Sequence, residues 1–511
     1  MNDWTEGYIA DIGYTYGYYA ELNPIRMRLP FLRANIIAPK VRTACELGFG
    51  QGLSANLHAV ASTTSWSGND FNPAHAAHAQ ELAAASNTKA LLSDEAFEAF
   101  CVREDLPDFD FIALHGIWSW ISDTNRTVIV DFIRRKLKVG GVLYVSYNTQ
   151  PGWGPMLPLR DLLAEHAEVA TASGQGITER VNNAIIFAET LFATNPNYIK
   201  HNPGVANSFK QVAMLDRHYL AHEYFNRDWL PMPFSRMVQW LEPAKLSFAC
   251  SATLLEHLDS INFTPEQAAL IKNQPDRNFR ETVRDFCTNQ RFRRDYWIRG
   301  ARHLNVLEQQ EAMRSERVVL VRPRAGVEMK VPCGLGEATL QPAIYDAILE
   351  QLTDHAPHTI GALEQRVCGP DFSFLQLAEA IMVLSGAGAL QSAQDEAAII
   401  AAKPRTDRLN AYLCNKARGN GDIIYLASPV TGGGIHVEQI FQLFLLARAA
   451  GKLSIEDLSH FAWNILAAQG KHLTSAGVQM TNDADNLAVV TTQAKAFNTS
   501  WLAVLRALQI A

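Results

Sequence analysis

A glycine-rich loop is the feature of this sequence that points most clearly to chemistry. Gly48, Gly50 and Gly52 alternate directly after an apolar run that ends at Leu47, and a helix is predicted from Leu53. Glycines let the backbone approach a ligand closely, and a following helix N-terminus presents free N–H groups to a negative charge. The loop therefore predicts a site for an anionic group such as the carboxylate of S-adenosylmethionine, although nicotinamide enzymes use similar loops.

Acidic residues stand where a nucleoside would need them. Glu46 immediately precedes the loop, and Asp70 ends the next strand candidate, 22 residues after Gly48, with Phe71 behind it. This interval suits a carboxylate that accepts hydrogen bonds from both ribose hydroxyls. Asp94 follows a third strand candidate, where it is expected either beside the adenine or in a solvated loop. The combination favours a nucleoside-containing cofactor over an ordinary strand–helix turn.

Aromatic side chains follow the fourth and fifth strand candidates. Trp118 and Trp120 come shortly after the fourth, and Tyr147 ends the fifth. Ligands of α/β sheets bind at the carboxyl ends of the strands, and aromatic faces attract sulfonium or ammonium cations. We therefore expect Trp118 and Tyr147 beside the reacting group, with burial of a tryptophan in the core as the alternative. His115 is expected to line the same pocket without acting as a base.

A third chemical group lies downstream, where His222, Glu223 and Tyr224 place a base, an acid and a phenol side by side. If this segment folds over the pocket, Glu223 could pair with an amine substrate while Tyr224 orients it. The alternative is the start of an amphipathic helix with exposed polar groups.

The elements that must position these residues read as an α/β fold. Short β-rich runs alternate with helical patterns over residues 41–150, which is typical of a doubly wound parallel sheet. Residues 1–40 form an expected cap segment, and residues 152–242 an expected helical insertion. Residues 311–397 resemble a winged helix, and residues 398–511 a further helical domain. The strand candidates are Thr43–Leu47, Ser65–Asn69, Phe109–Leu114, Val142–Tyr147, Leu246–Cys250 and Asp295–Arg299.

Composition narrows the class of protein. The 511 residues are 48% hydrophobic, which is ample for packed cores, and the net charge of -7 argues against nucleic acid as the main partner. Seven cysteines occur singly, without metal-ligand spacing, which predicts no metal site and fits a reducing compartment. No apolar run is long enough for a membrane insertion, and no signal peptide is recognised. We expect a cytoplasmic globular protein.

Several of these motifs resemble class I methyltransferases that carry a methyltransferase regulatory domain. The best-known relatives of this type are bacterial protein lysine methyltransferases, including rickettsial enzymes that act on outer-membrane proteins. The resemblance covers essentially the whole chain and is specific in residues 1–300. It is carried by Gly13–Tyr19, Glu46–Gly52, Asn69–Pro73, His115–Ser122, Leu137–Gly141, Ser146–Trp153, His222–Asn226 and Asp285–Gly300.

The resemblance implies a seven-stranded, Rossmann-like sheet with its last strand antiparallel, in a catalytic domain over residues 41–305. The regulatory segment would span residues 215–300. Tyr16 and Tyr18 would cover the methionine end of the cofactor. The other cofactor-binding residues that it implies are Glu46, Gly48, Gly50, Gly52, Asp70, Phe71, Asp94 and His115, and Trp118, Tyr147, Glu223 and Tyr224 would surround the acceptor.

The implied activity is S-adenosylmethionine-dependent methyl transfer by in-line displacement, to lysine side chains of a protein substrate. Three alternatives remain at this point. The acceptor could be a small molecule or a saccharide precursor. A dinucleotide-dependent oxidoreductase fits the glycine loop but not the downstream motifs. A non-catalytic regulator that binds DNA through the winged helix is disfavoured by the acidic net charge and by the lack of a basic recognition helix.

Overall fold

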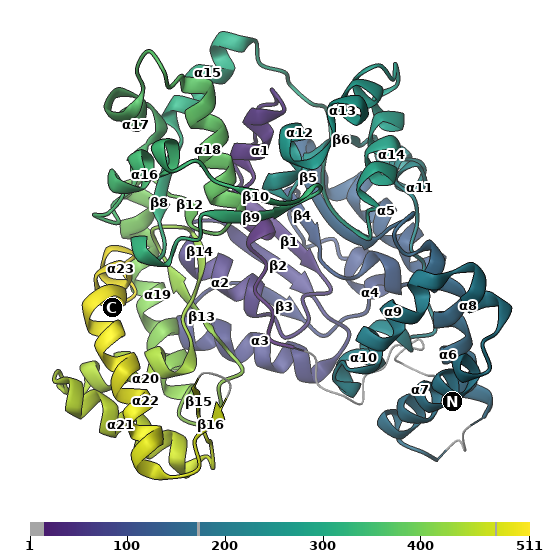
Figure 1. The fold of residues 1–511 in the computed structure, drawn as a ribbon. Coiled ribbons are helices and arrows are strands. Elements are labelled where there is room, and N and C mark those ends of the chain that lie inside the picture. Colours follow the sequence, from purple (N-terminus) through teal and green to yellow (C-terminus); the bar gives the residue numbers. More distant parts are fainter. Residues whose placement is uncertain (1–14, 171–173, 476–477) are drawn as a thin grey trace.

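A central seven-stranded sheet organises the protein (Figure 1). The computed structural model describes residues 15–170, 174–475 and 478–511, so residues 1–14 of the expected cap segment lie outside the described part. The strand order is β3-β2-β1-β4-β5-β7-β6, and β7 is antiparallel to both of its neighbours. The expected seven-stranded sheet with an antiparallel last strand is confirmed. Its strands are β1 (Thr43–Leu47), β2 (Ser65–Asn69), β3 (Leu91–Ser93), β4 (Phe109–Leu114), β5 (Leu137–Asn148), β6 (Ser247–Ser251) and β7 (Phe292–Ile298).

The strands are largely buried because helices cover both faces of the sheet, as expected for a parallel α/β arrangement. β5 starts five residues before the expected Val142, since Gly140, at φ +82°, lets the chain pass through an irregularity in its pairing with β4. The covering helices are α1 (Arg28–Arg33), α2 (Leu53–Ala61), α3 (Pro73–Ser86), α4 (Phe97–Cys101), α5 (Asp123–Lys136) and α11 (Phe234–Leu241). Short 3₁₀ turns lie at Ala20–Leu22 (η1), Trp118–Trp120 (η2), Gly154–Met156 (η3), Glu242–Ala244 (η4) and Leu254–His257 (η5).

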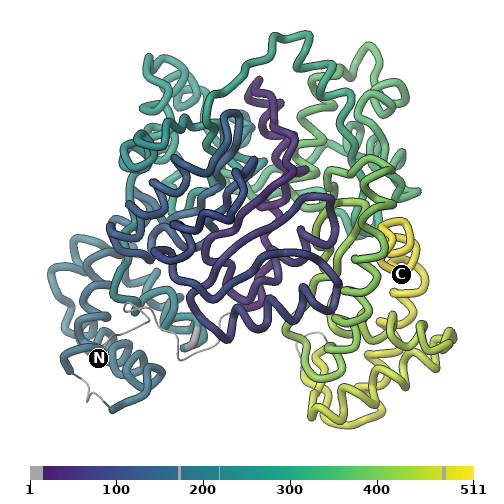
Figure 2. The backbone as a smooth tube through the Cα atoms, turned by 180° about the vertical axis from the view of Figure 1, so that it is seen from behind, coloured from purple at the N-terminus to yellow at the C-terminus, as the bar shows by residue number. Residues whose placement is uncertain are grey.

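A helical insertion follows β5 and has a small apolar core of its own. Figure 2 shows it on one flank of the sheet, opposite the C-terminal helices. It comprises α6 (Leu157–Val169), α7 (Ile177–Ala193), α8 (Asn197–His201), α9 (Pro203–Ala213) and α10 (Arg217–Tyr224).

Three helices lie between β6 and β7, namely α12 (Asp259–Asn262), α13 (Pro265–Lys272) and α14 (Arg277–Thr288). α13 starts at the expected capping box, in which the Thr264 hydroxyl accepts from the Gln267 N–H and the Gln267 side chain accepts from the Thr264 N–H. The seven-residue strand β7 begins three residues before the expected Asp295.

The next unit combines short helices with two small sheets, of orders β11-β8-β12 and β10-β9. Short helices beside small sheets do not by themselves identify a winged helix, so that interpretation stays a prediction. Its elements are α15 (Val306–Ser315), β8 (Arg317–Leu320), η6 (Arg324–Gly326), β9 (Lys330–Cys333), β10 (Gly336–Thr339), α16 (Pro342–Glu350), β11 (His358–Thr359), α17 (Ile360–Val367), α18 (Phe374–Gly386) and β12 (Leu390–Ser392).

The C-terminal unit shares a hydrophobic core with the sheet domain, because Leu53 and Leu57 of α2 and Leu82 of α3 pack into the same cluster. None of the described helices is both long and apolar enough to cross a bilayer. The unit comprises α19 (Glu396–Lys416), β13 (Tyr425–Ser428), β14 (Gly433–His436), α20 (Gln439–Ala449), α21 (Ile455–Ala468), β15 (Thr474–Ser475), β16 (Val478–Gln479), α22 (Asp483–Ala496), the π-helical η7 (Phe497–Trp501) and α23 (Leu502–Ala507).

Candidate active site

A cavity lies at the carboxyl ends of β1, β2 and β4, the edge at which α/β sheets bind their ligands. It encloses about 1180 Å³ of empty space, the solvent at its mouth included. Its wall contains residues of the glycine loop, the end of β2, the turn after β4 and the N-terminal segment. The lining residues are Thr15, Gly17, Tyr19, Glu46, Gly48–Gln51, Asn69–Phe71, His75, Ala96, Phe97, His115–Ile117, Trp120–Ser122, Asn125 and Asp228.

The glycine loop has the backbone that its sequence predicted. Gly48 and Gly50 line the cavity at φ +70° and +57°, a region that favours glycine. A Cβ on Gly48 would lie 2.5 Å from Cδ1 of Ile117, on the opposite wall. Gly52 lies outside the lining and precedes α2 at φ +69°, where a Cβ would meet Ala79 of α3 at 2.3 Å. Gly52 therefore shapes the loop by packing.

Glu46 is a buried acid that lacks a donor on one oxygen. It lines the cavity at 1% exposure, and its Oε2 atom has no hydrogen-bond partner within the described part of the chain. Burial raises the pKa of Glu46 to about 8, with a further contribution from the nearby Asp70 carboxylate. A buried carboxyl oxygen is stabilised when a ligand supplies an N–H or O–H donor. This atom fits a ligand that carries an ammonium or hydroxyl group.

Asp70 holds the glycine loop as well as lining the cavity. Its Oδ2 atom accepts the Gly50 N–H at 2.9 Å, and Oδ1 accepts the Asn72 N–H at 3.0 Å and lies 3.1 Å from Nδ1 of His75. Each carboxylate oxygen has two acceptor positions, so Oδ2 keeps one for a ligand hydroxyl. Phe71 lines the cavity beside it, as expected.

His115 forms part of an aromatic stack at the centre of the cavity wall. Tyr19 stacks on it with ring centroids 3.5 Å apart, and its Nδ1 atom lies 2.9 Å from the Tyr144 hydroxyl. Burial lowers the pKa of His115 to about 3, so the ring is neutral at physiological pH. A neutral ring leaves this wall free of positive charge and thus able to face a cationic ligand.

The structure corrects the expected positions of Tyr16 and Tyr18. The segment from Thr15 to Tyr19 has no helical turns, and its side chains alternate: Thr15, Gly17 and Tyr19 line the cavity. Tyr16 points instead to His78, at 5.0 Å, and Tyr18 packs on the C-terminal unit against Tyr425, also at 5.0 Å. Tyr19 is therefore the tyrosine of this segment that faces the site.

Trp118 also lies elsewhere than expected. Its side chain is fully buried in the main core, and its Nε1–H contacts the Met232 sulfur at 3.4 Å. η2 turns the two tryptophans apart, so that Trp120 lines the cavity in its place. The alternative of a core tryptophan therefore describes Trp118, and the aromatic face in the site belongs to Trp120.

Tyr147 is a second residue that belongs to the interior. It is fully buried in β5, and its hydroxyl donates to Asp295 of β7 at 2.8 Å. Since it does not line the cavity, its expected place beside the reacting group is corrected to a structural one.

The expected adenine-side acid, Asp94, is exposed and outside the lining, where Ala96 and Phe97 stand instead. Glu223 and Tyr224 lie on α10, also outside the lining. Burial raises the pKa of Glu223 to about 7, and Tyr224 packs edge-on to Trp153 at 5.9 Å. Tyr224 belongs to the apolar core of the insertion.

Sequence reasoning missed Asp228, the carboxylate that reaches the site from the segment after α10. The backbone around it is tied to the sheet domain, because the Leu230 N–H donates to the Ser119 carbonyl at 2.7 Å and the Met232 N–H to the Asn148 carbonyl at 3.1 Å. Its side chain is 36% exposed at the cavity mouth. No local sequence pattern predicts the position of Asp228, since these hydrogen bonds join residues more than 80 positions apart.

Known proteins resemble this chain over its full length. The "Predicted methyltransferase regulatory domain" model matches residues 216–299. The uncharacterized protein sll1526 of Synechocystis is 36% identical, with 99% of each chain covered. The uncharacterized protein RP789 of Rickettsia prowazekii is 26% identical over 54% of this chain and 49% of its own length.

Among solved structures, PKMT2 from Rickettsia typhi in complex with AdoHcy aligns with a TM-score of 0.68 at 15% identity, covering 97% of this chain and 99% of that one. This likeness shows a shared fold along the whole length. The full-length relative and the regulatory-domain match show that the chain belongs to the family of proteins that carry a methyltransferase regulatory domain, and its fold along the whole length is that of a class I methyltransferase.

Proposed function

We propose that the protein transfers methyl groups from S-adenosylmethionine to lysine side chains of a protein substrate. The observation that carries the proposal is the continuity of one cavity. Its inner part is the glycine loop with Glu46 and Asp70, and its mouth presents Trp120 and Asp228. The resemblance to PKMT2 in fold, over 97% of this chain and 99% of that one, adds support for a protein acceptor.

The inner cavity suits the methyl donor. The free Oε2 atom of Glu46 is an acceptor for the ammonium group of the methionine moiety, and the remaining position on Asp70 Oδ2 is an acceptor for a ribose hydroxyl. The backbone of Gly48 and Gly50 would lie against the donor, and a side chain on Gly48 would meet Ile117 of the cavity lining. When bound, S-adenosylmethionine supplies an electrophilic methyl group on a sulfonium.

The mouth of the cavity suits an amine acceptor. The face of Trp120 attracts an ammonium or a methylated ammonium, and the Asp228 carboxylate pairs with the charge. A lysine ammonium must lose a proton before its nitrogen can form the new C–N bond. Asp228, at the half-exposed mouth, can hold that proton and pass it to solvent. The protein otherwise acts by positioning and by excluding water.

Label transfer tests the proposal. Purified protein would be incubated with methyl-labelled S-adenosylmethionine and an extract divided into macromolecules and small molecules. Methyl-lysine in a protein band, with loss of label for Asp228→Asn, is the expected result. Label confined to small molecules would contradict the protein acceptor and favour a small-molecule or saccharide acceptor.

A further inference from the structure

A second cavity lies at the β6–β7 edge of the sheet, and none of its lining residues belongs to the candidate active site. It encloses about 1700 Å³, open solvent at its mouth included. One wall is the sheet edge with Phe248 and Arg293, and the other is α14 with Glu281 and Asp285. The segment from Thr253 to Phe263 forms the third wall.

The β9–β10 hairpin of the following unit contributes Pro332, Cys333 and Gly334 to the lining of this cavity. At the tip of β9–β10, the Gly334 N–H donates to the Asn262 side-chain oxygen at 2.8 Å, and the Leu335 N–H donates to the Ile261 carbonyl at 3.2 Å. A Cβ on Gly334 would lie 2.7 Å from the Asn262 carbonyl oxygen. The tip is thus fitted backbone to backbone against α12, and the cavity is a defined chamber between two units.

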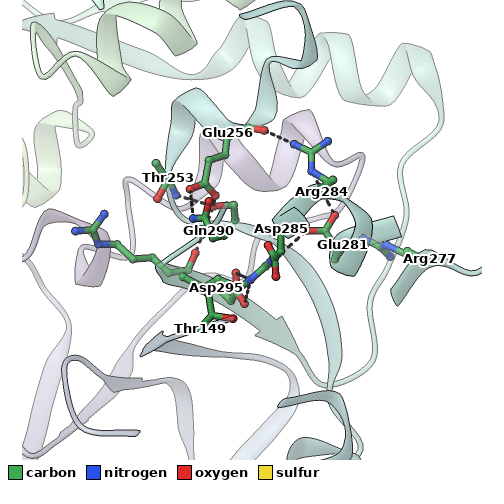
Figure 3. Close-up of polar contacts among 12 residues, drawn as sticks. Thr149, Thr253, Glu256, Arg277, Glu281, Arg284, Asp285, Gln290 and Asp295 are labelled. Carbon is green, nitrogen blue, oxygen red and sulfur yellow. Dashed lines mark hydrogen bonds and ion pairs between the residues drawn. The ribbon is translucent and has the colours of Figure 1, made fainter. Parts of the chain in front are cut away.

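The floor of the chamber holds one guanidinium and three carboxylates. Arg293, with a side chain 5% exposed, donates to Glu281 and Asp295, both at 2.9 Å, and to Asp285. Figure 3 shows Glu281 and Asp285 side by side on α14, facing Asp295 and Gln290. Within this cluster the carboxylates outnumber the guanidinium, whereas the lining as a whole balances four arginines against four acids, namely Arg33, Arg277, Arg284 and Arg293 against Glu256, Asp259, Glu281 and Asp285.

Asp285 is the member of this cluster whose hydrogen bonding is incomplete. The residue is 3% exposed, Arg293 occupies one oxygen, and its Oδ2 atom is buried without a partner among the residues that the structure describes. Burial raises the pKa of Asp285 to about 7. A buried carboxylate oxygen without a donor is costly, so a ligand that brings an N–H donor would be stabilised here.

The neighbouring cations do not satisfy this oxygen. Arg284 donates to Asp259 at 2.7 Å and to the Glu256 carbonyl at 2.6 Å, and its guanidinium lies over the Phe263 ring at 4.6 Å. Arg277, exposed at the rim, donates to the Ala249 carbonyl at 2.9 Å. The Arg284 guanidinium also lies 3.8 Å from Oε1 of Glu281, so each of these arginines is paired with a group other than Oδ2 of Asp285.

We propose that this chamber is a second ligand site, which binds a small organic cation, a primary alkylammonium, on Asp285 and Glu281. The ammonium supplies the missing donor to Oδ2 of Asp285. The alkyl part lies against the apolar side chains of the walls, Phe248 and Leu255 among them. The site takes a free cation from solution and is separate from the acceptor position beside Trp120.

Side-chain contacts and one step along β5 lead from the chamber to Ser119, the residue before Trp120. Arg293 binds Asp295, and Asp295 accepts from the Tyr147 hydroxyl on β5. At the next residue, the Asn148 N–H donates to the Ser119 hydroxyl at 2.8 Å, beside Trp120. Occupation of the chamber would thereby bias the acceptor end of the active site. This coupling rests on the proposed function, whereas the binding itself does not.

Calorimetric titration of the full chain with n-butylammonium chloride tests the proposal, with sodium chloride at the same ionic strength as the reference. Asp285→Asn is expected to weaken binding by about tenfold or more, because it removes the charge facing the ammonium. Asp105→Asn is the matched control: its side chain is 63% exposed, paired with Arg103 and outside the chamber, so affinity should change by less than about twofold.

Two further variants keep the result decisive. Thr288→Trp would place a large ring in the chamber three residues along α14 from Asp285 and should block binding there, which covers the case in which Asp285→Asn does not fold. Asp228→Asn removes the acceptor carboxylate of the active site and should leave binding in the chamber intact. No binding by the wild type, or binding lost in Asp228→Asn but kept in Asp285→Asn and Thr288→Trp, would overturn the proposal.

Discussion

The carboxylate of Asp70 accepts the backbone N–H of Gly50 at 2.9 Å, so the acid that faces the ribose position also fixes the loop that faces the methionine position. Asp70→Asn should therefore weaken AdoHcy binding by about ten- to a hundredfold, since the charge-assisted hydrogen bonds to the Gly50 N–H and to the ribose hydroxyl are both lost. Asp94→Asn, exposed outside the lining, should stay within about twofold of wild type. Calorimetry with AdoHcy measures the affinity of both variants. Equal losses of affinity in Asp70→Asn and Asp94→Asn would contradict the placement of Asp70 at the ribose.

Substitutions of the two tryptophans in η2 should have different effects on activity and on stability. Trp120→Ala is expected to lower kcat/KM for the acceptor about tenfold, because the cation loses an aromatic face, while AdoHcy affinity changes little. Trp118→Ala should instead cost about 3–5 kcal/mol of unfolding free energy, since the side chain is fully buried. Steady-state kinetics and denaturant unfolding distinguish them. If the Trp118→Ala protein kept its full stability and lost only turnover, Trp118 would have to be a residue of the active site.

Tyr147→Phe tests whether the buried phenol is structural. Removal of the hydroxyl leaves Asp295 without one donor, so the unfolding free energy should fall by about 1–2 kcal/mol. Turnover under conditions where the variant is folded should remain within about twofold of wild type, because the residue does not line the cavity. The opposite outcome, a large loss of kcat at unchanged stability, would favour a catalytic role.

Glu46 should make stability depend on pH in a definite direction. Its pKa is raised from 4.5 to about 8 in the folded protein, mainly by burial. Between these values the folded state keeps a proton that the unfolded state releases, so stability falls as pH rises, by at most about 1.4 kcal/mol per pH unit. The stability advantage of Glu46→Gln over wild type should therefore grow from pH 5 to pH 8.

Denaturant unfolding at intervals across that range measures this difference. Glu98→Gln, an exposed change outside the cavity, serves as the control and should follow the wild-type curve. If Glu46→Gln and wild type gave parallel curves, Glu46 would be ionised in the folded protein.

The sheet was predictable because short β-rich runs alternate with helical patterns along residues 41–150. Thr43–Leu47, Ser65–Asn69 and Phe109–Leu114 were expected with the bounds that they have. The glycine loop was predictable too, because positive φ angles restrict the residue type at Gly48 and Gly50.

The orientation of individual side chains was harder to predict. Tyr16 and Tyr18 differ from Tyr19 only by the alternation of an irregular segment, and Trp118 from Trp120 only by their places on one 3₁₀ turn. Asp228 reaches the cavity through contacts between distant segments, which no local pattern records. Residue type and spacing thus indicated the ligand, while packing decided which neighbour faces it.

Hydrogen–deuterium exchange with and without AdoHcy tests most directly whether the cavity at β1, β2 and β4 holds the methyl donor. Bound AdoHcy is expected to slow exchange at the amides of Gly48–Gln51 and His115–Ile117, and exchange around Asp285 in the chamber should not change. Binding of AdoHcy without protection of these two segments, or protection confined to the β6–β7 edge, would contradict this placement of the donor.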